Sequence, residues 1–301
     1  MGCSEARASR SSSSSGCPLR RASPTRADTT ARTRDGGRPP RIRRADRPRC
    51  AIGRSRRTRP RLPHRWRAVF RLDVYRPAHR DVAPVVFLVN GDGPPEVIAT
   101  AKDWGVYRSY GEHLAAHGLV GVPFNHRSTG RGEATEAAAA DVRSAIAFVR
   151  EHANELGVDK GRAGVWVFSA GGPFGLAPIL QRRPDWLRCA AGFYTFWDLA
   201  PFRVDLRPPV AERIRKWSCV TALDGETPDL PPLLLARAGR DSAAALEGAD
   251  TFIRRARERG VDLAVLDHPA GQHGFDTRDD DERSREIIRD TLDFFVRHLR
   301  E

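Results

Sequence analysis

Apolar residues from about position 66 onward alternate between short continuous runs and longer segments in which they recur every three or four positions. Short runs rich in β-branched and aromatic residues are typical of strands, whereas the longer spacing indicates amphipathic helices. The pattern predicts strands at 68–76, 84–89, 119–124, 164–168, 188–194, 232–238 and 262–267. It predicts helices at 106–117, 134–156, 173–182, 210–217, 243–259 and 282–299.

This alternation of strands and helices favours an α/β protein in which a mainly parallel sheet carries helices on both faces. The run at 84–89 is apolar throughout, so we expect that strand to be buried on both faces. One segment, 195–231, breaks the rhythm, because it is rich in proline and contains a single short helical stretch. We expect it to form a small cap over a pocket, and an irregular surface insertion is the alternative.

The loops that follow the predicted strands are where a ligand should bind, because ligands of open parallel sheets lie beyond the carboxyl ends of the strands. Four such loops carry polar or glycine-rich sequence: Asn-Gly-Asp-Gly at 90–93, Phe-Ser-Ala-Gly-Gly at 168–172, Gly-Arg-Asp at 239–241 and Gly-Gln-His-Gly-Phe at 271–275. Between Asp241 and His273, a helix of roughly 24 Å leads away and a strand of roughly 20 Å returns. Both residues should therefore emerge at the edge where Ser169 ends its own strand.

Ser169, His273 and Asp241 are together the groups that nucleophilic acyl transfer needs. A serine hydroxyl becomes an effective nucleophile when an imidazole takes its proton, and a carboxylate holds that imidazole in the required tautomer. We predict these roles for the three residues in that order. The alternatives are an N-cap role for Asp241 before helix 243–259, Asp198 as a rival acid, and His268 as a rival base that fits a structural role better.

The stretch 165–172 has the pattern of a strand, a tight turn and a helix, which is the setting of a nucleophile elbow. From about residue 70 to its C-terminus, the chain resembles the α/β-hydrolases, nearest to the dienelactone-hydrolase and esterase-like branches, whose members cleave esters or related acyl bonds. The motifs that carry the resemblance are Phe-Ser-Ala-Gly-Gly at 168–172, Ala-Gly-Arg-Asp at 238–241 and Gln-His-Gly-Phe-Asp at 272–276. Val167 stands where the Gly-x-Ser-x-Gly pattern has a glycine.

Negative charge that develops on the substrate carbonyl oxygen must be met by N–H donors fixed in advance. The resemblance implies the backbone of Ala170 as one donor. The esterase relatives carry His-Gly-Gly-Gly in the loop after strand 84–89, which matches Asp92 and Gly93 as further donors. We expect the Asp92 carboxylate to point away from the site, toward Arg127. Trp104, Tyr107, Phe196 and Trp197 are candidates for the pocket lining, with core packing as the alternative.

Charge divides the chain into two parts. The whole protein has a net charge of +13, but residues 1–67 hold 20 arginines and four acidic residues, or +16, and the remainder holds 31 basic and 34 acidic residues, or −3. A uniformly basic nucleic-acid-binding domain is therefore excluded. We expect 1–65 to be a disordered Arg/Ser-rich arm and 66–301 to be the folded domain. The arm has three interpretations: a solvated tail or wrongly assigned start, a polyanion-binding segment, or a transit peptide.

The five cysteines, Cys3, Cys17, Cys50, Cys189 and Cys219, are an odd number without metal-ligand spacing, so we expect free thiols and no metal site. No apolar run is long enough for a membrane span and no secretory signal is apparent, which favours a cytoplasmic protein. The sequence as a whole predicts a cofactor-free serine hydrolase that forms an acyl-enzyme with a small acyl substrate. A catalytically silent binding protein and a polyanion-binding accessory remain as alternatives, and the oligomeric state is open.

Overall fold

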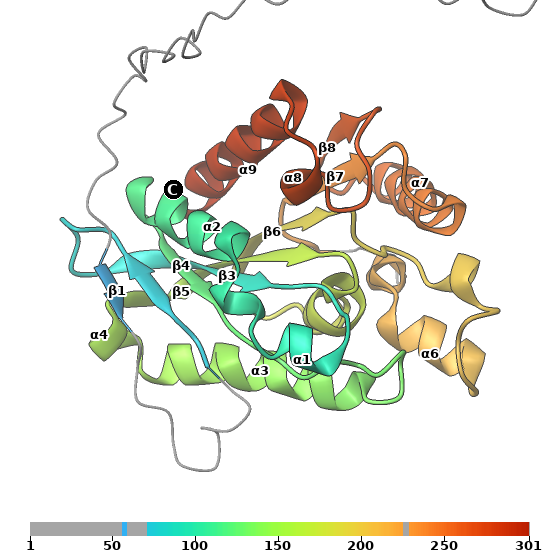
Figure 1. Ribbon diagram of the computed structural model, residues 1–301, viewed down its shortest axis with the longest axis horizontal. Coiled ribbons are helices and arrows are strands. Elements are labelled where there is room, and N and C mark those ends of the chain that lie inside the picture. Colours follow the sequence, from blue (N-terminus) through green and yellow to red (C-terminus); the bar gives the residue numbers. More distant parts are fainter. Residues whose placement is uncertain (1–55, 59–70, 225–228, 301) are drawn as a thin grey trace, which may run out of the picture. The chain divides into compact units, whose positions relative to one another are not determined.

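The computed structural model describes residues 56–58, 71–224 and 229–300. Within them, one sheet has the strand order β1-β2-β4-β3-β5-β6-β7-β8 (Figure 1). The strands are β1 (Arg56–Thr58), β2 (Val74–Arg76), β3 (Ala83–Val89), β4 (Val120–Pro123), β5 (Val158–Phe168), β6 (Leu187–Phe193), β7 (Leu233–Ala238) and β8 (Leu263–His268). The neighbours from β4 to β8 pair in parallel, and the pairs β1–β2 and β2–β4 are antiparallel. The predicted mainly parallel sheet is confirmed.

Helices cover both faces of this sheet. They are α1 (Pro95–Ile98), α2 (Gly105–Ala116), α3 (Thr135–Glu151), α4 (Ala153–Leu156), α5 (Ala177–Arg182), α6 (Val210–Trp217), α7 (Ala243–Glu258), α8 (Phe275–Arg278) and α9 (Glu282–Arg300). One apolar cluster packs against α3, α5 and α7, and a second packs against α2 and α9 on the opposite face (Figure 1). Successive residues of β3 enter the two clusters alternately, which explains why this strand is apolar throughout.

Most predicted elements form close to their predicted bounds, and four differ in detail. The predicted helix 134–156 is interrupted at His152, and its end at Gly157 is correct, because that glycine takes the left-handed conformation at φ 64°. The predicted helix 173–182 begins as a π-helix, η3 (Gly172–Leu176), before α5. The strand predicted at 164–168 starts earlier, at Val158. Of the strand predicted at 68–76, residues 68–70 lie outside the described part of the chain.

The predicted boundary between arm and domain at 65 is wrong, because β1 belongs to the sheet and pairs with β2. Arg57 in β1 forms an ion pair with the buried Asp73, with 2.6 Å between Nη2 and Oδ2. The Lys102 ammonium bonds the same carboxylate oxygen at 2.9 Å. β1 is an edge strand held by an ion pair and has no apolar pattern. The amino-acid composition of these residues therefore resembles that of the predicted arm. The other residues of the predicted arm lie outside the described residues.

The segment predicted as a cap contains regular structure. Within 195–224 it forms the short helices η4 (Ala200–Phe202), α6 and η5 (Cys219–Leu223), and Trp217, Cys219 and Leu223 are buried in the main apolar cluster. Cys189 and Cys219 are buried free thiols, and burial raises the pKa of both. The other three cysteines lie outside the described residues. No helix in the described part of the chain is long and apolar enough to cross a membrane.

The packing of α2 on β4 depends on the absence of a side chain at Gly121. A Cβ at this position would lie 2.8 Å from Cα of Gly111. We expect Gly121→Ala to lower the free energy of unfolding by roughly 1–3 kcal/mol, because backbone must move to admit the methyl group. Gly105→Ala is the matched control, since nothing lies within 4 Å of a Cβ there. Urea unfolding measures both, and equal stability of the two variants would contradict the packing argument.

Candidate active site

Ser169 follows β5 in a backbone conformation that non-glycine residues rarely adopt, with φ at 52°. Its N–H donates to the Phe193 carbonyl oxygen at 3.1 Å, and its own carbonyl oxygen accepts from Gly172 N at 3.2 Å and Thr195 Oγ1 at 3.0 Å. The end of β6 therefore holds the strained turn from both sides. This is the geometry expected for a nucleophile elbow.

The small residues beside Ser169 are required by close backbone contacts. A Cβ on Gly171 would lie 2.7 Å from the carbonyl oxygen of Val89 and 3.0 Å from that of Asn90. Val167, which departs from the usual motif, is buried within β5, and the turn forms beside it. The missing glycine therefore does not prevent the left-handed turn at Ser169.

The structure brings together the three residues predicted as nucleophile, base and acid. His273 and Asp241 lie in the loops after β8 and β7. Nδ1 of His273 lies 2.6 Å from Oδ2 of Asp241, and its Nε2 lies 2.7 Å from Oγ of Ser169. The Asp241 side chain is only 8% exposed, and its other oxygen accepts from Ser242 N at 2.7 Å. The arrangement is a continuous hydrogen-bond chain from carboxylate to imidazole to hydroxyl.

The alternatives raised for these residues do not hold. Ser242, not Asp241, is the N-cap of α7, and its side chain accepts from Ala245 N. The Asp198 carboxylate accepts from Ala200 N and Ser218 Oγ, whereas Asp241 is the carboxylate bonded to His273. His268 is buried and contacts Ser284 Oγ at 3.0 Å, so it has a structural role.

The loop after β3 lies against Ser169, because a Cβ on Gly91 would be 3.0 Å from Cβ of Ser169. Ala170, Asp92 and Gly93 line the same cleft as Ser169. Within the described residues, the backbone N–H groups of these three donate to no protein acceptor. They are therefore free to donate to a substrate.

The Asp92 carboxylate does not face Arg127 as predicted. It accepts from Thr129 N at 3.0 Å and also from the Thr129 hydroxyl. Arg127 instead forms a two-bond pair with Asp141 at 2.7 and 2.8 Å. The segment after β4 thus satisfies the Asp92 charge, and Ser128 Oγ donates to the Gly93 carbonyl oxygen at 2.6 Å, which fixes the same loop.

The cleft at Ser169 has a volume of about 740 Å³. Its walls include apolar side chains from the 195–224 segment: Phe196, Leu199, Leu206 and Trp217. Of the four aromatic residues predicted as candidates, only Phe196 lines this cleft. Tyr107 packs on Phe168 with 5.2 Å between ring centroids, and Trp197 packs on Phe252 at 4.4 Å. Trp104 lies beside Tyr107 at 5.9 Å.

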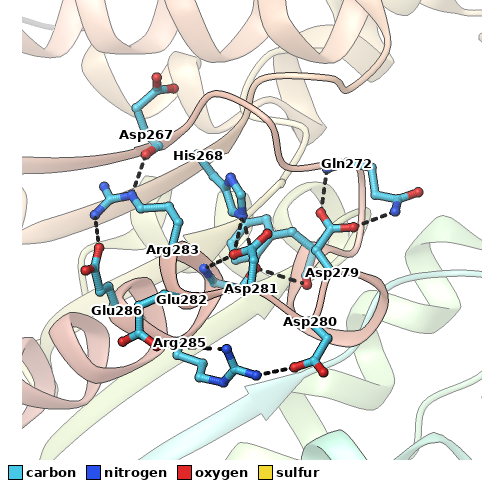
Figure 2. Close-up of polar contacts among 12 residues, drawn as sticks. Asp267, His268, Gln272, Asp279, Asp280, Asp281, Glu282, Arg283, Arg285 and Glu286 are labelled. Atoms are coloured by element: carbon cyan, nitrogen blue, oxygen red, sulfur yellow. Dashed lines mark hydrogen bonds and ion pairs between the residues drawn. The ribbon is translucent and has the colours of Figure 1, made fainter.

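Hydrogen bonds of His268 and Gln272 hold in place the loop that carries His273, and Figure 2 shows these two residues with Asp279 and Asp281. Asp279 accepts from Gln272 N at 3.0 Å and Gln272 Nε2 at 2.5 Å, and these bonds lower the pKa of its carboxyl. Nε2 of His268 lies 3.0 Å from Ser284 Oγ and 3.3 Å from Asp281. Ligand atoms of His268, Asp279 and Asp281 all lie within 4.8 Å of one another, a grouping that could hold a metal ion. Because each side chain already has a protein partner, the grouping is explained by its role in fixing the loop.

Sequence reasoning missed Tyr194 and Asp276, which lie near His273. The Tyr194 ring lies 4.8 Å from the His273 ring, and its hydroxyl donates to Asp276 at 2.7 Å. Asp276 is the last residue of the motif at 272–276, which was its only signal in the sequence. Tyr194 takes a left-handed φ of 39°, which no sequence pattern indicates.

Comparisons with known proteins identify similar sequences. A family model described as BD-FAE matches residues 72–181. The chain is 26% identical over 233 residues to the probable carboxylic ester hydrolase LipM of Mycobacterium tuberculosis, a match that covers 68% of this chain and 53% of that protein. The chain therefore spans about half the length of this curated relative.

Solved structures of esterases are also similar. The Est2 esterase of Thermogutta terrifontis has a TM-score of 0.59 and 21% identity, covering 76% of this chain and 87% of its own. Brefeldin A esterase, a bacterial homologue of human hormone-sensitive lipase, has a TM-score of 0.60 and 20% identity, covering 85% and 80%. An esterase of Pyrobaculum calidifontis has a TM-score of 0.60 and 21% identity, covering 82% and 87%. The predicted α/β-hydrolase fold is confirmed, and the dienelactone-hydrolase branch is not singled out.

The elbow geometry predicts a sharp difference between two glycine substitutions. We expect Gly171→Ala to lower the rate of p-nitrophenyl acetate hydrolysis about 100-fold, because its methyl group would push Ser169 away from the loop after β3. Gly105→Ala should stay within about threefold, since nothing lies within 4 Å of a Cβ there. Similar rates for the two variants would show that the close contact at Gly171 does not position Ser169.

Proposed function

We propose that this chain, a member of the α/β-hydrolase superfamily, is a serine hydrolase that cleaves carboxylic esters through an acyl-enzyme on Ser169. The hydrogen-bond chain from Asp241 through His273 to Ser169, at 2.6 and 2.7 Å, carries the proposal. The similarity to LipM and to the three esterases supports the choice of ester substrates. No cofactor or metal ion is needed for this chemistry.

The reaction follows from the positions of these groups. Nε2 of His273 takes the hydroxyl proton as Oγ of Ser169 forms a bond to the ester carbonyl carbon, and the carbonyl oxygen becomes an oxyanion. The N–H groups of Ala170 and of Asp92 or Gly93 stabilise that charge. When the intermediate collapses, the C–O bond to the leaving group breaks and His273 returns the proton to the leaving alcohol. His273 then activates a water molecule that hydrolyses the acyl-enzyme and regenerates Ser169.

The substrate is a small molecule whose acyl or alcohol part occupies the cleft beside Ser169. The apolar side chains of Phe196, Leu199 and Trp217 favour hydrocarbon groups at this wall. Leu199 precedes η4 and Trp217 is the last residue of α6, so the described part of the predicted cap, 195–224, shapes the pocket. Residues 56–58, 71–224 and 229–300 contribute to the catalytic domain.

The nucleophile assignment is tested with p-nitrophenyl esters of increasing acyl length. We expect wild-type protein to hydrolyse the short-chain esters and Ser169→Ala to lose this activity to the level of the uncatalysed reaction, because no other hydroxyl lies within reach of His273 Nε2 among the described residues. Stopped-flow release of p-nitrophenol in wild type should show a burst if the acyl-enzyme accumulates. Full activity in a folded Ser169→Ala variant would contradict the proposal.

Two substitutions test whether Asp241 or Asp198 is the acid of the triad. We expect Asp241→Asn to lower kcat about 10³–10⁴-fold, because the amide cannot hold the His273 tautomer or stabilise the imidazolium. Asp198→Asn should remain within about tenfold, since its carboxylate bonds Ser218 and Ala200. Steady-state kinetics of the two variants provide the measurement. A larger loss in Asp198→Asn than in Asp241→Asn would reverse the assignment.

A further inference from the structure

Besides Asp241, a second carboxylate lies close to His273. It belongs to Asp276, in the first turn of α8. Its two oxygens accept separate phenol hydrogen bonds: Tyr110 Oη donates to Oδ2 at 2.7 Å and Tyr194 Oη donates to Oδ1 at 2.7 Å. Both tyrosines are buried. An ionised carboxylate offers an acceptor to each hydroxyl, so the network is fully satisfied when Asp276 carries its charge.

Tyr194 connects this carboxylate to the reacting groups. Its ring packs on the His273 imidazole with 4.8 Å between centroids, at an interplanar angle of 59°. Its N–H donates to the Ala236 carbonyl oxygen at 2.9 Å, which anchors the residue to β7. The left-handed φ of 39° shows that the surrounding structure imposes this position on Tyr194. The bond to Asp276 is what fixes the far end of the ring.

Asp276 and His273 also interact through their charges. Burial raises the pKa of Asp276 above its ordinary value, and the two phenol donors and the nearby His273 act in the opposite direction. The charge of Asp276 in turn raises the pKa of the buried Tyr107, Tyr110 and Tyr194, in addition to the effect of burial. Asp241 remains the only described carboxylate bonded directly to His273.

We infer that Asp276 is a positioning residue that supports His273, because it fixes Tyr194 against the imidazole and stabilises the imidazolium formed when Ser169 gives up its proton. The inference rests on the proposed function of Ser169 and His273. Direct stabilisation comes from Asp241, and Asp276 adds a weaker interaction across the tyrosine network. Among the described residues, the groups near His273 are Ser169 after β5, Asp241 after β7, Tyr194 and Phe196 after β6, and Asp276 in α8.

The charge of Asp276 gives the expected effect its sign. A nearby carboxylate favours the protonated imidazole that forms during the reaction. Asp276→Asn removes that charge, so kcat should fall with little change in KM, because the imidazolium forms only after the substrate has bound. The value of kcat/KM should fall about 10-fold, because the imidazolium is stabilised less and Tyr194 is held less firmly.

Two further variants separate charge from positioning. Tyr194→Phe keeps the Asp276 charge and removes the hydrogen bond that holds the ring, so kcat should fall about threefold to tenfold with KM nearly unchanged. Tyr110→Phe is the matched control, because it removes the other phenol donor and its ring does not contact His273; its kcat should stay within about twofold. Urea unfolding establishes that each variant is folded.

Two readouts decide the inference. The first is kcat and KM for a short-chain ester. The second is the rate at which a fluorophosphonate modifies Ser169, which needs no ester hydrolysis. Lower kcat and slower modification in Tyr194→Phe, with Tyr110→Phe close to wild type, support the inference. A Tyr194→Phe protein that matches wild type in either readout, or equal losses in Tyr194→Phe and Tyr110→Phe, overturns it. Should Asp276→Asn fail to fold, Tyr194→Phe alone decides. Absence of ester hydrolysis in wild type, with slower modification of Ser169 in Tyr194→Phe, would remove only the proposed function.

Discussion

The left-handed turn at Ser169 is the constraint on which the site depends. A non-glycine residue at φ 52° is strained, and the strain is sustained because Ser169 bonds to Phe193 and Thr195 at the end of β6. The turn exposes the hydroxyl at the carboxyl edge of the sheet, where the loops after β7 and β8 bring Asp241 and His273. Gly171 completes this geometry, because it lets the turn approach the backbone of Val89 and Asn90. The parallel sheet thus holds Oγ of Ser169 in a fixed position.

The loops around the turn are fixed by polar contacts rather than by the apolar core. Asp92 is held by Thr129 in the loop after β3, and Gln272 is held by Asp279 in the loop that carries His273. Each contact restrains the backbone beside a group that takes part in the proposed reaction. Rigid positioning of this kind lowers the barrier, because few degrees of freedom are left to lose when a substrate binds. The apolar wall contributed by the 195–224 segment closes the other side of the cleft.

Much of this could be predicted from the sequence, because strand and helix periodicity and the residues after each strand follow local rules. The parallel sheet, the helix at 210–217 and the approach of Asp241 and His273 to Ser169 all follow from such patterns. Contacts between distant residues could not be predicted. β1 depends on the ion pair of Arg57 with Asp73, the Asp92 carboxylate faces Thr129 instead of Arg127, and Asp276 meets Tyr110 and Tyr194 from two other elements. Each of these contacts joins residues that are distant in the sequence, and each residue could have had other partners. The periodicity of apolar residues does not indicate which partner is selected.

The central claim is that Ser169 is an activated nucleophile. Its most direct test is intact-mass spectrometry of the folded full-length protein after treatment with a fluorophosphonate, followed by peptide mapping. The account predicts one covalent adduct per chain, located on Ser169 and absent in the Ser169→Ala variant. A folded wild-type protein that stays unmodified, or an adduct that persists in Ser169→Ala, would contradict it.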